Sequence, residues 1–136
     1  MTARMRIGDL ARRAEVTPRT VRFYETTGLL PPGAREGSGQ HYYPEAALAR
    51  LRKIDQLKKL GLSLEEIGSV IDLYFEDPSG LRPKREVLAI LRRHLAEADQ
   101  KIGALEAFRA DLQTHIARFE LWFELAQHQD KDDDHG

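Results

Sequence analysis

The sequence contains no cysteine among its 136 residues. A chain without cysteine forms no disulfide, gives no thiolate ligand to a metal or an iron–sulfur cluster, and carries no cysteine nucleophile. No uninterrupted apolar run approaches the roughly 20 residues that a membrane helix needs, and the amino terminus lacks the apolar stretch of a secretory signal. With a mean hydropathy of -0.52, the chain is expected to be soluble and cytoplasmic, without a membrane partner.

Recognisable enzyme motifs are also missing. The sequence has no glycine-rich phosphate loop, no nucleophile with an evident base and no paired carboxylates in a strand-loop setting. The five histidines show no tight ligand spacing, apart from His128 and His135 beside the terminal aspartates. That pair suits nickel or cobalt, whereas a disordered tail is the simpler interpretation. We therefore expect no enzymatic activity, no cofactor and no metal site.

The charges are unevenly distributed, although the net charge is only -1. Residues 1–62 carry 12 Lys or Arg against 6 Asp or Glu, a net charge of +6, whereas residues 63–136 carry 9 against 16, a net charge of -7. A basic front half indicates a polyanionic partner. A solvated basic face is the alternative interpretation.

The front half begins with two predicted short helices. Thr17 is a good N-cap, Pro18 suits the first position of a helix, and Gly28 is suited to the position just after its end. Two short helices joined by a tight turn form a helix-turn-helix. The preceding helix, over 7–14, is predicted by apolar residues that share one face: Ile7, Leu10, Ala11 and Ala14.

A small β wing and two further helices complete the predicted front domain. Glycine and proline on either side of 40–43 predict a short hairpin. Pro44 opens a third helix that ends at Gly61, and Ser63 begins a fourth through the Ser-x-x-Glu form of a capping box. The segment 77–80 closes this unit.

A long helix is predicted after the front domain, because no proline interrupts the sequence from Pro83 to about Gln127. Positions spaced alternately by three and four residues are apolar in eleven of twelve cases, as in a coiled-coil seam. The helix would be roughly 60 Å long, more than the front domain can cover, so the simplest arrangement is a two-fold dimer. The predicted dimerisation residues are Leu88, Leu91, Leu95, Ile102, Leu105, Leu112, Ile116, Phe119 and Phe123.

The predicted fold class is mainly α: a winged helix-turn-helix domain with a small β wing, followed by a long C-terminal coiled-coil dimerisation helix. The expected boundaries are 1–76 for the DNA-binding domain, 77–82 for a linker, 83–128 for the coiled-coil helix and 129–136 for a disordered acidic tail. Arg109 is the polar exception in the seam, where it sets the register or extends to water.

The second predicted helix carries the candidate DNA contacts. Phosphate contacts position a helix-turn-helix, and contacts to base edges specify its sequence. Arg19 and Arg22 are the strongest candidates, because a guanidinium group makes paired hydrogen bonds to guanine or phosphate; as isolated residues they are also compatible with a solvated surface. Val21 is expected to point inward. The other candidates on this helix are Thr17, Thr20 and Tyr24.

The sequence closely resembles MerR-family bacterial transcription regulators over about residues 5–75. This resemblance implies a winged-helix dimer joined by an antiparallel coiled coil, with a pseudo-palindromic operator in a promoter as its double-stranded DNA partner. It also implies that the protein bends and untwists the promoter for RNA polymerase, and that an effector shifts the balance between two DNA shapes. The matching runs, in order, are Arg6–Ala11, Val16–Glu25, Gly28–Pro32, Arg50–Ile54 and Leu60–Ile67.

By position, the resemblance assigns Thr17, Arg19, Thr20, Arg22 and Tyr24 to the recognition helix. It assigns Gln40, His41 and Tyr43 to the wing, with Lys58 within reach of a flanking phosphate. Many wings of the family read Gly-Tyr-Arg-x-Tyr, and here a histidine stands in place of that permanent cation. His41 either makes a pH-dependent contact to phosphate or is a polar wing residue without a switching role.

The sequence gives little information about the effector. Members of the family that sense soft metals or redox stress use cysteines near the coiled coil, which this chain lacks. An aromatic cluster of Phe119, Trp122 and Phe123 is a candidate pocket for a small apolar effector, and ordinary dimer core is its alternative. Two other functions remain open: a DNA-bending architectural factor without an effector, and a protein–protein adaptor that uses the coiled coil.

Overall fold

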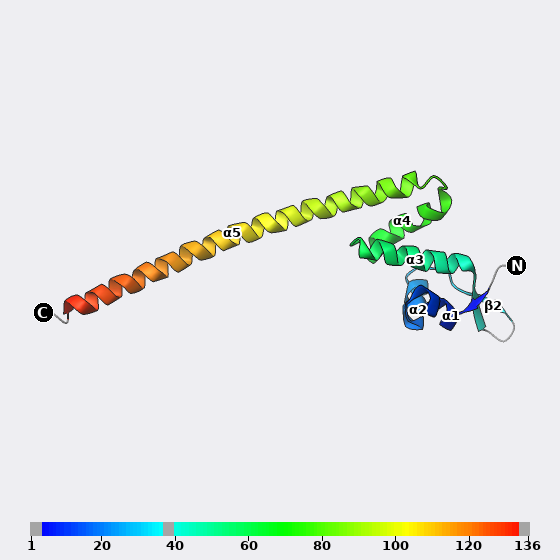
Figure 1. Ribbon diagram of the computed structural model, residues 1–136, viewed down its shortest axis with the longest axis horizontal. Helices are drawn as coiled ribbons and strands as arrows, with labels where there is room; N and C mark the ends of the chain where they lie inside the picture. Colours follow the sequence, from blue (N-terminus) through cyan, green and yellow to red (C-terminus); the bar gives the residue numbers. More distant parts are fainter. Residues whose placement is uncertain (1–3, 37–39, 134–136) are drawn as a thin grey trace. The chain divides into compact units, whose positions relative to one another are not determined.

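The computed structural model describes residues 4–36 and 40–133 (Figure 1). The chain consists of two compact units, which are residues 1–91, the front unit, and residues 92–136, the second unit. The predicted class, mainly helical with a small wing and a long C-terminal helix, is confirmed. The elements are β1 (Met5–Arg6), α1 (Ile7–Ala14), α2 (Pro18–Thr26), β2 (Ala34–Glu36), β3 (Gln40–Tyr43), α3 (Glu45–Lys59), α4 (Leu64–Glu76) and α5 (Leu81–Asp133).

The helix-turn-helix forms as the sequence predicts. After α1 the chain turns at Glu15, whose φ of 58° is left-handed. Thr17 caps α2, because its hydroxyl accepts a hydrogen bond from the Thr20 backbone N–H at 3.1 Å, and Pro18 occupies the first helical position. Gly28, with a φ of 82°, supplies the left-handed residue after the helix. Both ends of α2 are therefore fixed by local sequence.

The wing is one part of a three-stranded antiparallel sheet in the order β1-β3-β2. The hairpin of β2 and β3 was predicted; its turn at 37–39 lies outside the described residues. Strand β1 was not predicted, because its two residues are too few to show an alternating pattern and its partner is distant in sequence. Met5 pairs with Tyr43, and its side chain is buried in the core.

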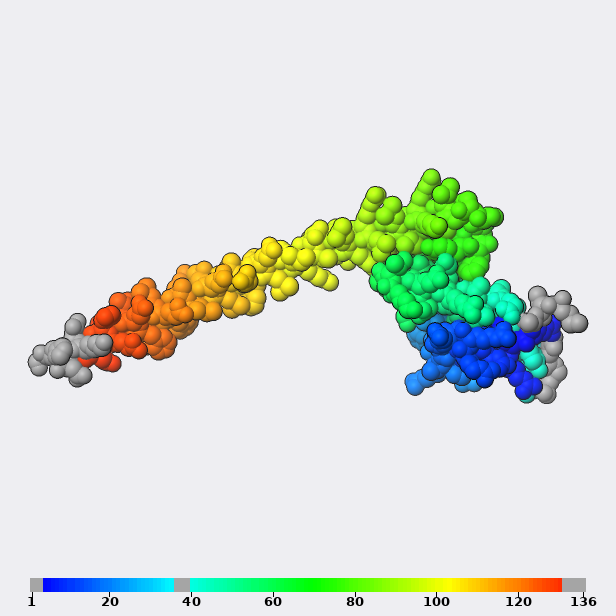
Figure 2. Space-filling view, viewed as in Figure 1, coloured from blue at the N-terminus to red at the C-terminus, as the bar shows by residue number. Residues whose placement is uncertain are grey.

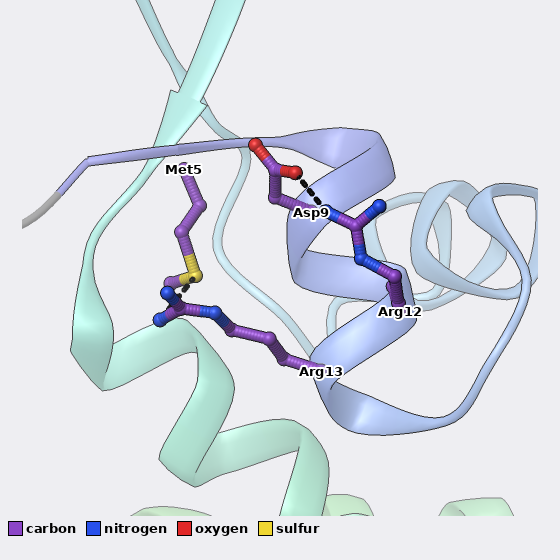
Figure 3. Close-up of polar contacts among 4 residues, drawn as sticks. All are labelled: Met5, Asp9, Arg12 and Arg13. Atoms are coloured by element: carbon purple, nitrogen blue, oxygen red, sulfur yellow. Dashed lines mark hydrogen bonds and ion pairs between the residues drawn. The ribbon is translucent and has the colours of Figure 1, made fainter.

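Figure 3 shows how β1 meets α1. The Met5 side chain points toward Arg13, whose guanidinium lies 3.7 Å from the sulfur. Arg12, one residue earlier, turns the other way and forms an ion pair with Asp9 in the first turn of α1. The first strand is therefore attached to the helix-turn-helix through Met5, while the Arg12–Asp9 pair stays on the surface.

Helices α3 and α4 both contribute to the core of the front unit. Helix α3 follows Pro44 and ends before Gly61, whose φ is 97°. At the start of α4, Ser63 and Glu66 form both hydrogen bonds of a capping box, at 2.9 and 3.1 Å. Burial of one face of each helix holds the unit together; the fully buried residues of the two helices are Leu51, Ile54, Leu57, Ile67, Val70 and Ile71.

Helix α5 begins at Leu81, inside the predicted 77–82 linker. The Asp77 carboxylate accepts hydrogen bonds from the backbone N–H groups of Ser79 and Arg82, at 3.0 and 2.9 Å. The Ser79 hydroxyl accepts one from the N–H of Leu81 at 3.2 Å. These acceptors satisfy N–H groups at the start of the helix, which allows it to begin before Pro83. The first turns of α5 pack on the front unit through Pro83, Val87 and Ile90.

The carboxyl-terminal part of α5 is longer than predicted. Residues 129–133, expected in a disordered acidic tail, are helical, and residues 134–136 lie outside the described part of the chain. The helix continues because no proline or glycine follows Gly103 before Gly136, and a run of charged residues does not by itself end a helix. Figure 2 shows the yellow-to-red part of α5 as a single helix.

The Asp77 cap predicts a pH-dependent contribution to stability. Hydrogen bonds from the Ser79 hydroxyl and the Arg82 N–H hold the pKa of Asp77 below its usual value. A lowered pKa in the folded state means that the carboxylate stabilises the fold above its unfolded pKa, and that this contribution is lost as the pH falls through the folded pKa. We expect Asp77→Asn to lower the Tm at pH 7 and to flatten the fall in Tm between pH 5 and pH 3. Asp111→Asn, at an exposed carboxylate of α5, is the control in the same thermal unfolding series, and identical profiles for the two variants would contradict the cap.

Candidate nucleic-acid interface

Helix α2 has one buried and one exposed face. Val21 and Tyr24 are 0% and 4% exposed and belong to the core, which confirms that Val21 points inward. Because a helix repeats every 3.6 residues, residues at positions i, i+3, i+4 and i+7 share the opposite face. That face, the α2 stripe, consists of four exposed residues: Arg19, Arg22, Phe23 and Thr26.

The α2 stripe presents two cations and one large apolar side chain. Within residues 4–36 and 40–133, neither Arg19 nor Arg22 forms a salt bridge, and both are exposed. Thr26 is exposed, and its hydroxyl donates to the Arg22 carbonyl at 2.9 Å. Phe23 is 49% exposed and was not among the predicted site residues. Its signal in the sequence was its spacing of four residues from Arg19.

The amino-terminal end of α2 adds two hydroxyl groups. The Thr17 and Thr20 hydroxyl oxygens lie 3.0 Å apart, and the Thr17 oxygen also accepts the Thr20 N–H. Their first role is therefore to cap the helix. The amino-terminal end of a helix carries a partial positive charge that favours phosphate, which is compatible with a backbone contact here.

The wing carries its positive charge at a position that sequence reasoning missed. In the β2–β3 ladder Arg35 lies opposite His41, and its Nε donates to His41 Nε2 at 3.4 Å. His41 Nδ1 lies 3.1 Å from the Gly33 carbonyl, and because a carbonyl only accepts, Nδ1 carries the hydrogen. His41 is thus oriented between two groups, and the exposed cation of this strand pair is Arg35.

Two tyrosines predicted as DNA contacts are core residues. Tyr24 and Tyr43 are 4% and 2% exposed, so their rings serve the fold, and contact of their hydroxyl groups with DNA stays a prediction. Burial, followed by the hydrogen bond to the Glu25 carboxylate, raises the pKa of Tyr43 well above its usual value, so its hydroxyl remains a donor to Glu25. Lys58 Nζ, in turn, donates to the Tyr24 hydroxyl at 3.4 Å. These contacts fix α2 against the wing and against α3.

A hollow of about 480 Å³ lies between α2 and the sheet. Arg22 lines it from α2, and Gln40, His41 and Tyr43 line it from β3, so four predicted site residues meet here. Arg6 of β1, which was not predicted, brings a second guanidinium to the same hollow. Thr17 and Lys58 are not among its lining residues. The arrangement places cations and hydrogen-bonding groups on one surface, as contact with a phosphate backbone requires.

The α5 seam is exposed along the second unit. Its large apolar residues between Leu95 and Phe123 are 44–66% exposed. At its beginning Leu88 is 46% exposed, whereas Leu91 is partly buried against the core of the front unit. A row of exposed apolar side chains this long is unusual for a soluble monomer and marks an interaction surface.

The aromatic end of α5 forms a shallow hollow of about 440 Å³. The rings of Trp122 and Phe123 pack edge to face, with centroids 4.9 Å apart, and Phe119 lies on the same surface with His115 and Arg118. The predicted effector role of this cluster stays a prediction. Among the described residues, no group of three His, Asp or Glu is placed to hold a metal ion, and no helix there has both the length and the apolarity to cross a membrane.

The front unit is a winged helix-turn-helix, the class of protein in which a short second helix and a β hairpin form a DNA-binding surface. Residues 5–73 match the family described as MerR HTH family regulatory protein, and residues 48–115 match the family described as MerR, DNA binding. The chain belongs to the MerR family.

Relatives of known sequence are similar over most of their length. The HTH-type transcriptional regulator PA4778 of Pseudomonas aeruginosa is 35% identical, over 80% of this chain and 80% of its own. The HTH-type transcriptional regulator ZntR of Escherichia coli is 35% identical, over 79% of this chain and 75% of its own. The relatives are transcriptional regulators.

Two solved structures are similar to the fold. The transcription regulator PbrR691 from Ralstonia metallidurans CH34, in complex with lead(II), has a TM-score of 0.64 and 36% identity, and covers 80% of this chain and 83% of its own. A MerR family regulator from Bacillus cereus has a TM-score of 0.55 and 26% identity, and covers 77% of this chain and 76% of its own.

Charge reversal on the α2 stripe tests the interface. We expect Arg19→Glu and Arg22→Glu each to weaken binding to an operator duplex by at least about tenfold, because one good arginine contact to a base contributes about 1–3 kcal/mol. Fluorescence anisotropy with labelled duplex measures the Kd. Arg85→Glu, on the exposed surface of α5, changes the net charge equally and is expected to bind within about twofold of wild type. Equal losses in all three variants would mean that only total charge matters.

A glutamate in the α5 seam tests self-association. Ile102 is 53% exposed in the single chain, and we expect Ile102→Glu to shift the protein from dimer to monomer, because a charge buried in a coiled-coil seam is strongly unfavourable. Sedimentation equilibrium measures the mass. Gln100→Glu introduces the same side chain in the same turn but off the seam, and should remain dimeric. A wild-type protein that is monomeric at micromolar concentration would contradict the seam.

Proposed function

We propose that this protein is a homodimeric, non-enzymatic transcriptional regulator that binds a two-fold-symmetric site in double-stranded promoter DNA in the cytoplasm. The observation that carries this proposal is the α2 stripe: Arg19 and Arg22 are exposed on one face of a helix whose other face is buried. Arginine side chains on such a helix reach both phosphate oxygens and guanine edges in the major groove.

The wing extends the surface beside α2. Its side chains would donate hydrogen bonds to the sugar-phosphate backbone next to the major groove. The residues that carry these donor groups are Arg35, His41, Arg6 and Gln40. Lys58 is exposed and suits a flanking phosphate. Backbone contacts of this kind fix the register of the recognition helix without reading sequence.

The dimer follows from the α5 seam. Two copies paired through their seams would bury the side chains that a single chain leaves about half exposed, and apolar burial is the largest favourable term in such association. We propose the antiparallel pairing that the family resemblance implies, with Arg109 in the seam setting the register. A closed two-fold dimer has two symmetry-related α2 helices. Each would bind one half-site, so the DNA site is expected to be pseudo-palindromic.

Control of transcription is proposed to act through DNA shape. A dimer that holds two half-sites on a promoter with a long spacer favours a bent and untwisted duplex, and so changes the alignment that RNA polymerase meets. An effector would shift the balance between two states only if it binds one of them more tightly. The absence of cysteine excludes a thiolate metal site for that effector, so we propose a small apolar molecule at Phe119, Trp122 and Phe123, with dimer packing as the competing use of these rings.

Selection of binding sites from a random duplex library tests the proposed function. We expect enrichment of one inverted repeat with half-site centres about one or two helical turns apart. The selection is run at moderate salt, because phosphate contacts make affinity strongly salt-dependent. Arg85→Glu serves as the matched control and should select the same motif. Binding without any enriched motif would instead support the architectural factor, and no binding above that of a generic basic protein would support the adaptor.

A further inference from the structure

Phe23 is a large apolar side chain among cations. It is 49% exposed and shares the α2 stripe with Arg19, four residues earlier, and Thr26, three residues later. Its ring lies against Tyr24, with centroids 6.0 Å apart and planes tilted by 48°. Because Val21 and Tyr24 occupy the buried face of α2, the Phe23 ring lies on the opposite, exposed face.

The other half-exposed phenylalanine of the front unit makes a different contact. Phe75 of α4 is also 49% exposed, and the Arg50 guanidinium lies over its ring at 6.0 Å. Phe75 is therefore used within the fold. Phe23, by contrast, lies on the α2 stripe, the surface that we propose to contact DNA.

We infer that Phe23 reads thymine methyl groups in the major groove. This inference rests on the proposed function. Of the four bases, only thymine presents a methyl group in the major groove, and apolar side chains contact it there. A helix in the groove meets base edges and not base faces, so a ring on its outer stripe is placed for methyl contact rather than for stacking. Phe23 would thus specify T·A pairs beside the guanines or phosphates held by Arg19 and Arg22.

The test uses the operator selected with the full-length wild-type protein, with each thymine replaced in turn by deoxyuridine. This replacement removes one methyl group and leaves base pairing intact. We expect one symmetry-related pair of positions at which the wild-type Kd rises about fourfold per half-site, the effect of one lost buried methyl group. Phe23→Ala should bind more weakly overall and show no change at those positions.

Phe75→Ala is the matched control, because it removes an equally exposed ring from a different helix. It is expected to keep the wild-type deoxyuridine profile. Circular dichroism and the Tm establish that both variants fold. The inference is overturned if no thymine methyl group matters to the wild type, or if the same positions still matter in Phe23→Ala. Failure to select any operator would overturn the proposed function and, with it, the inference about Phe23. An operator whose binding does not depend on any thymine methyl group would overturn only the inference about Phe23 and would leave the proposed function intact.

Discussion

Burial of one face of α2 is the constraint on which the candidate interface depends. Val21 and Tyr24 enter the core, and once these two side chains are inside, the rotation of the helix about its own axis is fixed. The α2 stripe then faces outward by helical periodicity alone. The buried Tyr43, through its hydroxyl bond to Glu25, fixes the same helix against the sheet. The buried residues Val21 and Tyr24 thus determine the direction in which the exposed residues of the α2 stripe point.

The sequence predicted the elements whose signals are local. Thr17, Ser63 and Gly28 each determine a helix end through a hydrogen bond or a left-handed residue within a few positions, and the structure places all three as expected. Strand β1 escaped prediction because its evidence is its pairing with Tyr42 and Tyr43, about 37 positions away. The end of α5 escaped for a different reason: charge composition says little about where a helix stops when no glycine or proline intervenes.

The candidate site was predicted unevenly for a similar reason. The exposure of Arg19 and Arg22 on one face of α2 could be predicted, because residue type and helical spacing can be read directly from the sequence. The burial of Tyr24 was not predicted, because an aromatic residue with a hydroxyl group suits both DNA contact and core packing. The exposure of the Phe23 ring was not predicted, because an apolar residue is expected to be buried. Residue type alone therefore gives the cations of such an interface more readily than its apolar contacts.

The pairing of Arg35 with His41 means that the cation of the wing belongs to a strand pair and not to one position. The two side chains lie opposite each other across the β2–β3 ladder, so an arginine on either strand brings a guanidinium to the same face of the hairpin. If each position were compared separately with other wings, position 41 would be counted as the loss of a positive charge, because His41 stands where many wings of the family have arginine. Evolution of such wings is expected to show compensating exchange across the ladder, with basic residues moving between strands while the electrostatic surface offered to DNA is preserved.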